Sequence, residues 1–362
     1  MHMGRTRWVT VLVCLIVVTL LAGVAGCAKQ QSATQQPSGS APAEQPKTIE
    51  LTFNDHDPAE SMVGQIWTKW AKWVNENSGG KVKVNVVSGG ALLKGNEAFR
   101  GVQTGVVAGA HYVVDREDGF LLNLVTTMPF LGLPDIKDSR EIYKQLLQKF
   151  PQMQSEWRGV KVLAVAMMPG THFHFSKTAV KTPADIVGKK IAIAEGIKAE
   201  TLVALKATPV EIDIADMYQS VERGMVDGVY NHMPVLNVFG VLPLLKYHLL
   251  FGEGGIDMTP MMAIMNADTF NKLPQDVQQL LEQSAKVWED TAYENTLKDI
   301  EQCMKMAQEK NHTIVTLTPD EIAQWREAVK PVHEKWLKEC EEKGLPGKEI
   351  YDTVLQLAKQ AQ

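Results

Sequence analysis

The chain contains little cysteine and no excess of positive charge, and each shortage excludes a class of protein. Four cysteines in 362 residues are too few for a disulfide scaffold. Asp and Glu number 42 against 37 Lys and Arg, which argues against nucleic acid as the main partner because phosphate binding needs a basic patch. Charged residues at 22% and hydrophobic residues at 45% are ordinary globular values, so wholesale disorder is also excluded.

Long apolar runs are scarce too, since the sequence has one, at its N-terminus, and this excludes a multi-span membrane protein. The basic segment Met1–Trp8 precedes the apolar run Val9–Ala22, and Val-Ala-Gly stands directly before Cys27. This order indicates an export signal and resembles a bacterial lipoprotein signal with a lipid on Cys27. The alternative is an uncleaved membrane anchor. We expect residues 1–27 to be a signal peptide, and the remainder to be an exported, membrane-anchored lipoprotein in the periplasm or at the cell surface.

Residues 28–47 are rich in Gln, Ser, Ala and Pro, which is typical of a flexible tether. About 315 residues follow, a length that usually forms two domains. The folded part retains Cys303 and Cys340, which either form a disulfide or remain two separate thiols. Their spacing matches no zinc motif.

The first part of the folded region alternates strand and helix patterns. Apolar residues at a period of two or of 3.6 predict strands and helices in the order β-α-β-α-β, over residues 49–54, 59–77, 81–87, 96–105 and 106–113. This order predicts a parallel α/β domain. Three tryptophans spaced three apart in the first helix indicate core packing.

A second series of the same kind is predicted over residues 160–256. Strands are expected over 160–168, 171–176, 189–194, 209–212 and 225–230, and helices over 198–206 and 216–224. Thr182-Pro183-Ala184-Asp185 has the pattern of a helix start. The methionine-rich segment Met258–Met265 is expected to fill the core.

The last part is mainly helical. A helix over residues 274–309 would be about 54 Å long, enough to cross two domains. A strand is expected over 312–316, a capping box at Thr318–Glu321 opens another helix, and the last helix covers 348–361.

The predicted fold class is therefore α/β, with two domains that enclose a hinged ligand cleft at the carboxyl ends of the strands. We expect the first domain to comprise residues 48–169 and 257–297, and the second to comprise residues 170–256 and 298–362.

Three segments resemble the solute-binding proteins of TRAP transporters, the DctP family. They read TPADIVGKKIAI (182–193), DMYQSVERGMVDG (216–228) and TFNKLPQDVQQLLEQS (269–284). The resemblance covers residues 49–358. It implies a periplasmic-binding-protein fold braced by a long helix, and a receptor that captures a small organic solute and delivers it to an ion-gradient-driven permease.

The sequence departs from this family at one position. Most members carry Lys-Ile-Arg-Val in one strand, and the arginine clamps a carboxylate through two parallel hydrogen bonds. Here the strand reads Lys-Ile-Ala-Ile, with Ala192 at the arginine position. Either the ligand is not a simple carboxylate but a sulfonate, alcohol, amine or neutral polar solute, or other groups bind its anion.

Candidate ligand-binding residues follow from the resemblance and from their places at strand ends. They are His56, Tyr112, His172, Glu195, Ile214, Asn231 and His232. For each there is a structural alternative, such as a turn, a helix cap or core packing. Five of the nine histidines, His111 and His174 among them, fall where strands end or turn, and an imidazole can donate or accept a hydrogen bond there. Glu195, if ionised, would favour an amine as the ligand.

No nucleophile motif, HExxH motif or glycine-rich phosphate loop is present, so we expect neither an enzyme nor a cofactor. His172 and His174 form a His-x-His pair, but no third ligand has suitable spacing, and no metal site is predicted. Two alternatives stay open: a metal-binding receptor of another uptake system, and a receptor that presents its ligand to a membrane sensor kinase.

Overall fold

The computed structural model describes residues 47–114, 118–193 and 197–361, and residues 46–362 form one compact unit. The predicted signal peptide, Cys27 and nearly all of the predicted tether lie outside the described residues, as does Glu195. Within the described ranges, no helix combines the length and apolar character needed to cross a bilayer.

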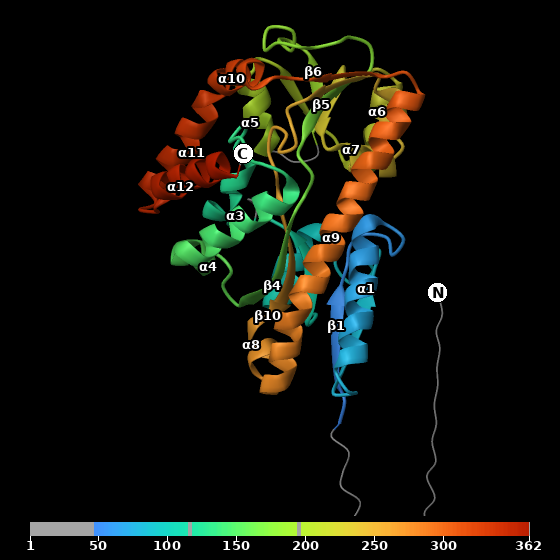
Figure 1. The fold of residues 1–362 in the computed structure, drawn as a ribbon, viewed down its shortest axis with the longest axis vertical. Helices are drawn as coiled ribbons and strands as arrows, with labels where there is room; N and C mark the ends of the chain where they lie inside the picture. The colour runs from blue at the N-terminus through green and yellow to red at the C-terminus, as the bar shows by residue number, and fades with distance from the viewer. Residues whose placement is uncertain (1–46, 115–117, 194–196, 362) are drawn as a thin grey trace, which may run out of the picture. The chain divides into compact units, whose positions relative to one another are not determined.

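The unit contains two β-sheets, which confirms the predicted α/β class (Figure 1). The first sheet has the order β2-β1-β3-β10-β4, and β1 pairs in parallel with both β2 and β3 as predicted. Strand β10 is antiparallel to β3 and β4, which the sequence did not predict. The bounds are β1 Ile49–Asn54, β2 Val82–Val87, β3 Gly109–Val113, β4 Val160–Met167 and β10 Pro260–Asn266.

The second sheet has the order β11-β9-β5-β8-β6-β7. Its strands are β5 His172–Phe175, β6 Lys190–Ile193, β7 Thr208–Glu211, β8 Gly228–Asn231, β9 Tyr247–Leu250 and β11 Thr313–Thr316. The expectation that the strand over 160–168 begins the second series is wrong, because β4 pairs with β10 in the first sheet. Apolar clusters cover both faces of β4, which explains its continuous apolar run.

Helices surround both sheets. The α-helices are α1 Met62–Asn77, α2 Gly95–Gln103, α3 Ile136–Lys149, α4 Pro151–Ser155, α5 Ile197–Ala204, α6 Met217–Glu222, α7 Met233–Val238, α8 Ala267–Asn271, α9 Gln275–Glu309, α10 Pro319–Ala328, α11 Lys330–Glu342 and α12 Gly347–Gln360. The 3-10 helices are η1 Leu122–Thr127, η2 Ile214–Asp216 and η3 Leu242–Leu244.

Of the two sequence motifs that predicted helix starts, one begins a helix and the other forms a turn. Thr318 and Glu321 form both hydrogen bonds of a capping box at the start of α10, as predicted. The prediction of a helix after Thr182 is wrong. The Thr182 hydroxyl donates to Asp185 Oδ2 at 2.8 Å, but it closes a turn, because Gly188 at φ +73° redirects the chain into β6.

The 35-residue helix α9 runs along both halves of the unit, as predicted (Figure 1). Its first part contacts α1 and β4, and its last part contacts α7 and β11. Cys303 on α9 and Cys340 on α11 are buried in different apolar clusters, and no disulfide joins them. Helices α11 and α12 pack into the cluster that contains η1 and α3, beside the first sheet. Strand β11 belongs to the second sheet, and Trp325 of α10 packs in the apolar cluster of that sheet.

Two connecting segments lead from the first sheet to the second. Residues 168–171 and 256–259 run antiparallel and hydrogen-bond to each other: Met168 N donates to Thr259 O, and Ile256 N donates to Thr171 O. Gly170 lets residues 253–255 lie directly against the first segment, since a Cβ there would lie 2.6 Å from the carbonyl oxygen of Glu253. The segments bring the carboxyl ends of strands from both sheets close to one crossing point.

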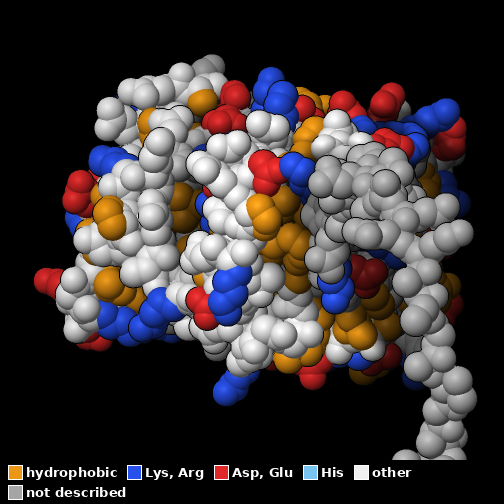
Figure 2. Space-filling view, turned by 90° about the horizontal axis from the view of Figure 1, so that it is seen from below, with side chains coloured by type: hydrophobic (Ala, Val, Ile, Leu, Met, Phe, Trp, Pro, Cys, Tyr) orange, Lys and Arg blue, Asp and Glu red, His pale blue; other side chains and the backbone are white. Residues whose placement is uncertain are grey.

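The charges on the surface are mixed. Figure 2 shows basic and acidic side chains interspersed with apolar ones over the visible part of one face, without a large area of one sign.

Glu289 attaches α9 to the first sheet, and its removal should destabilise the fold. Its carboxylate is buried, accepts from Val165 N at 3.1 Å and pairs with Lys144 Nζ at 2.9 Å. We expect Glu289→Ala to lower the free energy of unfolding by about 2 kcal/mol, because Val165 N loses its partner. Denaturant titration measures this. Lys286→Ala, which breaks an exposed pair with Asp290, should change it by about 0.5 kcal/mol or less, and an equal loss in both variants would contradict the assignment.

Candidate functional site

A large cleft is lined by residues of both sheets and of the connecting segments. Its volume is about 1120 Å³. The first-sheet side contributes the ends of β1 and β3 and one face of α2, and the second-sheet side contributes α5 and the end of β8. Polar lining residues include His56, Tyr112, Thr171, Lys198, Asn231 and His232. The cleft is therefore larger than the ~300–1,000 Å³ of a typical ligand pocket, as expected of a site that narrows on binding.

The second-sheet wall offers hydrogen-bond donors. Asn231 Oδ1 accepts from His232 N at 2.9 Å, and no described residue accepts from Asn231 Nδ2. His232 Nδ1 accepts from Val235 N at 3.3 Å and caps α7, which assigns the proton of the neutral ring to Nε2. Burial, and then the charge of Lys198, lower the pKa of His232 to about 3, so the ring is neutral near pH 7. Both side chains can thus donate to an oxygen in the cleft.

Lys198 adds a positive charge to the same wall. It lies in the first turn of α5, is 5% exposed and lines the cleft. Its Nζ lies 5.5 Å from the centre of the Tyr230 ring. Lys198 therefore places a cationic group on the same wall as Asn231 and His232.

The first-sheet wall carries a cluster of two aspartates and two histidines, Asp55, His56, Asp57 and His111, which we call the Asp-His cluster. Its first three members follow β1, and His111 belongs to β3, which is adjacent to β1. Asp57 N donates to Asp55 Oδ1 at 3.1 Å, which closes the Asx-turn that the sequence offers here. His111 Nδ1 lies 3.1 Å from Asp57 Oδ2 and 3.6 Å from Asp55 Oδ1.

The two histidines of the Asp-His cluster differ in charge. Burial alone would lower the pKa of His111, but the carboxylates of Asp55 and Asp57 outweigh it and raise the pKa to about 9. Burial, and then the charge of His111, lower the pKa of His56 to about 4. At neutral pH the cluster therefore holds one imidazolium and one neutral imidazole. Gly95 leaves room for the His56 ring, since a Cβ there would lie 3.2 Å from it.

A protein-family model described as "Bacterial extracellular solute-binding protein, family 7" matches residues 53–339. The chain belongs to this family. Its members are the solute-binding proteins of TRAP transporters, as the three sequence segments indicated, and they are receptors for small organic solutes rather than enzymes.

Two characterised relatives show the range of the family. The ectoine-binding periplasmic protein TeaA of Halomonas elongata is 26% identical over 306 residues, which cover 80% of this chain and 85% of the relative. The C4-dicarboxylate-binding periplasmic protein DctP of Rhodobacter capsulatus is 25% identical over 306 residues, 79% of this chain and 86% of the relative.

Solved structures confirm the two-domain fold. A TRAP solute-binding protein from Rhodoferax ferrireducens in complex with copurified benzoate superimposes with a TM-score of 0.76 at 19% identity, covering 87% of this chain and 98% of that one. A marine-metagenome receptor specific for aromatic acids, bound to 3-hydroxybenzoate, gives a TM-score of 0.77 at 21% identity, covering 87% and 99%.

The structure brings four of the seven predicted site residues to the cleft: His56, Tyr112, Asn231 and His232. The Tyr112 hydroxyl donates to Asp118 Oδ2 at 2.8 Å. Two others lie elsewhere, and the seventh, Glu195, is not described. His172 accepts from Phe251 N at 3.3 Å, and Ile214 packs against the apolar cluster around Met217. Ala192 is buried in that same cluster and is absent from the cleft lining.

His174 belongs to a row of hydrogen-bonded histidines. Its Nε2 faces the carbonyl oxygen of Asn231 at 3.1 Å and therefore donates, so its Nδ1 accepts from His248 Nδ1 at 2.8 Å. His248 Nε2 in turn accepts from His312 Nδ1 at 3.0 Å. Both nitrogens of His174 are thus engaged, and the His172–His174 pair does not form a metal-binding group.

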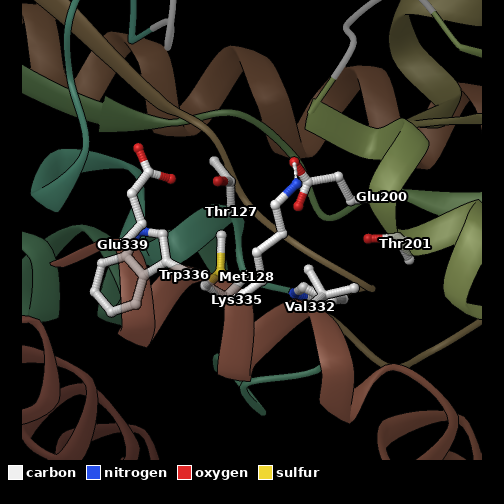
Figure 3. Close-up of a pocket in the computed structure, with 9 residues that line it drawn as sticks. Thr127, Met128, Glu200, Thr201, Val332, Lys335, Trp336 and Glu339 are labelled. Atoms are coloured by element: carbon white, nitrogen blue, oxygen red, sulfur yellow. Dashed lines mark hydrogen bonds and ion pairs between the residues drawn. The ribbon is translucent and has the colours of Figure 1, made fainter. Parts of the chain in front are cut away.

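A second, smaller hollow lies between α5, α11 and the end of η1 (Figure 3). Lys335 Nζ pairs with Glu200 Oε1 at 2.9 Å across it. Its volume of about 10 Å³ leaves space for about one water molecule, so it is too small for an organic solute.

Sequence reasoning missed most of the other polar lining residues, Lys198, Thr171 and Arg100 among them. Lys198 starts a predicted helix, where a lysine is usually exposed and carries no signal. Its position after a predicted strand could have identified it. In an α/β fold, the first turn of the helix that follows a strand faces the ligand crevice.

Proposed function

We propose that this chain is an extracytoplasmic receptor that binds one small organic anion in the cleft and delivers it to a TRAP-type permease driven by an ion gradient. The observation that carries the proposal is Lys198, a buried cation beside the donor groups of Asn231 and His232. These groups lie on the wall where the family resemblance predicts the solute.

Lys198 takes over the role of the missing arginine in this proposal. Ala192 removes the guanidinium fork that selects a planar carboxylate. An ammonium group is a compact point charge with three rotatable donors, so it accepts a carboxylate or a sulfonate with little discrimination of shape. The ligand class is therefore broader than in members with the arginine.

The ligands of related proteins support an acidic solute. Structures of the same fold hold benzoate, 3-hydroxybenzoate and β-D-glucuronate, and one relative is named for C4-dicarboxylates. The relative TeaA is named for ectoine, a carboxylate that is also cationic and so has no net charge. The screen below therefore includes amines and neutral compounds.

A thermal-shift screen of residues 46–362 tests the proposal. The panel contains carboxylates, sulfonates, amines, alcohols and neutral polar solutes, all in EDTA. A ligand at 100 times its dissociation constant stabilises the fold by about 2.7 kcal/mol, which raises the melting temperature by a few degrees. We expect carboxylates or sulfonates to give the shift. A shift given by amines or neutral solutes alone, or enzymatic turnover of the bound solute, would contradict the proposal.

We also propose that the chain is exported and anchored to the membrane through a lipid on Cys27. The support is the basic, apolar and small-residue order of the N-terminal segment. Mass spectrometry of the mature protein should find a new N-terminus at Cys27 carrying a diacylglyceryl group. Cys27→Ser should release the protein from the membrane fraction, and a Cys27→Ser protein still retained there would indicate an uncleaved anchor.

A further inference from the structure

We propose that the Asp-His cluster is a binding site for a divalent transition-metal ion, with Zn²⁺ as the best match, held by His56, Asp57 and His111. The site lies in the wall of the cleft opposite Lys198. The proposal goes beyond the solute-binding role and does not depend on it.

The three ligand atoms lie close enough together to share one ion. The distances to Asp57 Oδ2 are 3.1 Å from His111 Nδ1 and 3.7 Å from His56 Nε2, and all three ligand atoms lie within 4.8 Å of one another. In a tetrahedral zinc site with bonds of 2.0–2.1 Å, the ligand atoms are about 3.3 Å apart. Small side-chain movements therefore suffice to close the site.

Several buried polar atoms of the cluster have no hydrogen-bond partner among the described residues. His111 is 2% exposed: its Nδ1 faces the carboxylates of Asp57 and Asp55, whereas its Nε2 makes no hydrogen bond with another described residue. Asp55 Oδ2 and His56 Nδ1 are buried and equally without a partner. Such atoms are rare in folded proteins and cost about 1–3 kcal/mol each. An ion bound by the cluster would replace the proton on His111 Nδ1, which the same carboxylates face.

The ring orientations define the movement that ion binding requires. The His56 and His111 rings are stacked, with 4.5 Å between their centres and 4° between their planes. A ring nitrogen offers its lone pair in the plane of the ring, so one ion cannot lie in both parallel planes. His56 must turn, and its side chain, 24% exposed, has the freedom that buried His111 lacks.

The donor set selects the kind of ion. Two imidazoles and one carboxylate suit Zn²⁺ and its transition-metal neighbours, whereas Ca²⁺ and Mg²⁺ prefer oxygen ligands alone. Asp55 Oδ1, 3.6 Å from His111 Nδ1, is positioned to orient that ring. With three protein ligands, a fourth position stays open, and His56 places it at the cleft. If the proposed function holds, an oxygen of the solute can occupy that position.

Isothermal titration of EDTA-stripped protein with Zn²⁺, without any solute, tests the inference. We expect about one Zn²⁺ per chain and no measurable binding of Ca²⁺ or Mg²⁺. His56→Ala and Asp57→Asn should each weaken binding by at least about 10- to 100-fold, the range found even for loss of an outer-shell partner. Both residues lie at the partly exposed side of the cluster, so these variants are expected to fold, which circular dichroism verifies.

His312→Gln is the matched control, because it removes a partly exposed histidine that lies outside the cluster. It should leave Zn²⁺ binding unchanged. The absence of Zn²⁺ binding, or binding that persists in both His56→Ala and Asp57→Asn, would overturn the inference. The solute screen runs in EDTA and this titration runs without solute, so a failure of one is distinguishable from a failure of the other.

Discussion

Replacing Lys198 with glutamine should weaken solute binding by about 30-fold or more. Truncating one partner of a buried, hydrogen-bonded charge pair costs about 2–5 kcal/mol, and each 1.4 kcal/mol is a factor of ten in affinity. Lys198 is 5% exposed and lines the cleft. In the glutamine variant, little water can reach this position to solvate the anion of a bound solute. Calorimetric titration with the best anion from the screen measures the change.

Lys190→Gln is the control for this experiment. Lys190 is exposed at the start of β6, and its removal changes the net charge by the same amount without touching the cleft. Its affinity should stay within a factor of about two of the parent, as expected for a screened surface charge. Equal losses in both variants would show that Lys198 acts through overall charge and would contradict its role as the anion partner.

Acid should destabilise the fold between pH 6.5 and 4.5, before most carboxylates are protonated. Burial is the first cause that lowers the pKa values of His172 to about 3, of His248 to about 4, and of His174 well below its usual range. These groups are neutral in the folded chain and protonated in the unfolded chain below pH 6.5. The unfolded state therefore binds more protons there, and stability falls as pH falls. Each fully shifted histidine costs about 1.4 kcal/mol per pH unit in this window.

His174→Gln should reduce this pH dependence, because glutamine keeps hydrogen-bonding capacity and cannot be protonated. His312→Gln should retain most of it, since His312 lies at the partly exposed end of the row. Denaturant titrations at several pH values measure the slope. A parent protein whose stability is constant between pH 6.5 and 4.5 would contradict the neutral assignment of these histidines.

His111 has the opposite effect on the pH dependence of stability. Its pKa is raised to about 9, so the stability that its charge provides is complete below pH 6.5 and is lost as pH rises toward 9. Together, the two effects place the maximum of stability near pH 6.5. A maximum well above pH 8 would show that His111 is not an imidazolium in the folded chain.

Regular elements were predictable because their signals are local. The strand over 49–54 and the long helix over 274–309 were predicted to within a residue, since periodicity and capping fix them within a few turns. Strand pairing was less predictable. Nothing in the run over 160–168 shows that it joins β10, because that contact closes across roughly a hundred residues of chain.

The site was predictable where a residue stands at a strand end. His56, Asn231 and His232 follow strands whose carboxyl ends meet at the cleft, so position alone located them. The sequence contained no sign that His172 differs from these residues. Its ring accepts from Phe251 N, just after β9, and the pairing of β5 with β9 is not visible in the sequence. The grouping of His111 with Asp55 and Asp57 depends on the register of β1 and β3, which the sequence does not define.

A crystal structure of the chain with its best ligand from the screen tests the central claim most directly. We expect one solute in the cleft, with an anionic oxygen within hydrogen-bond distance of Lys198 Nζ and further contacts to Asn231 and His232. A solute bound in the cleft with no group near Lys198, or bound outside the cleft, would contradict it.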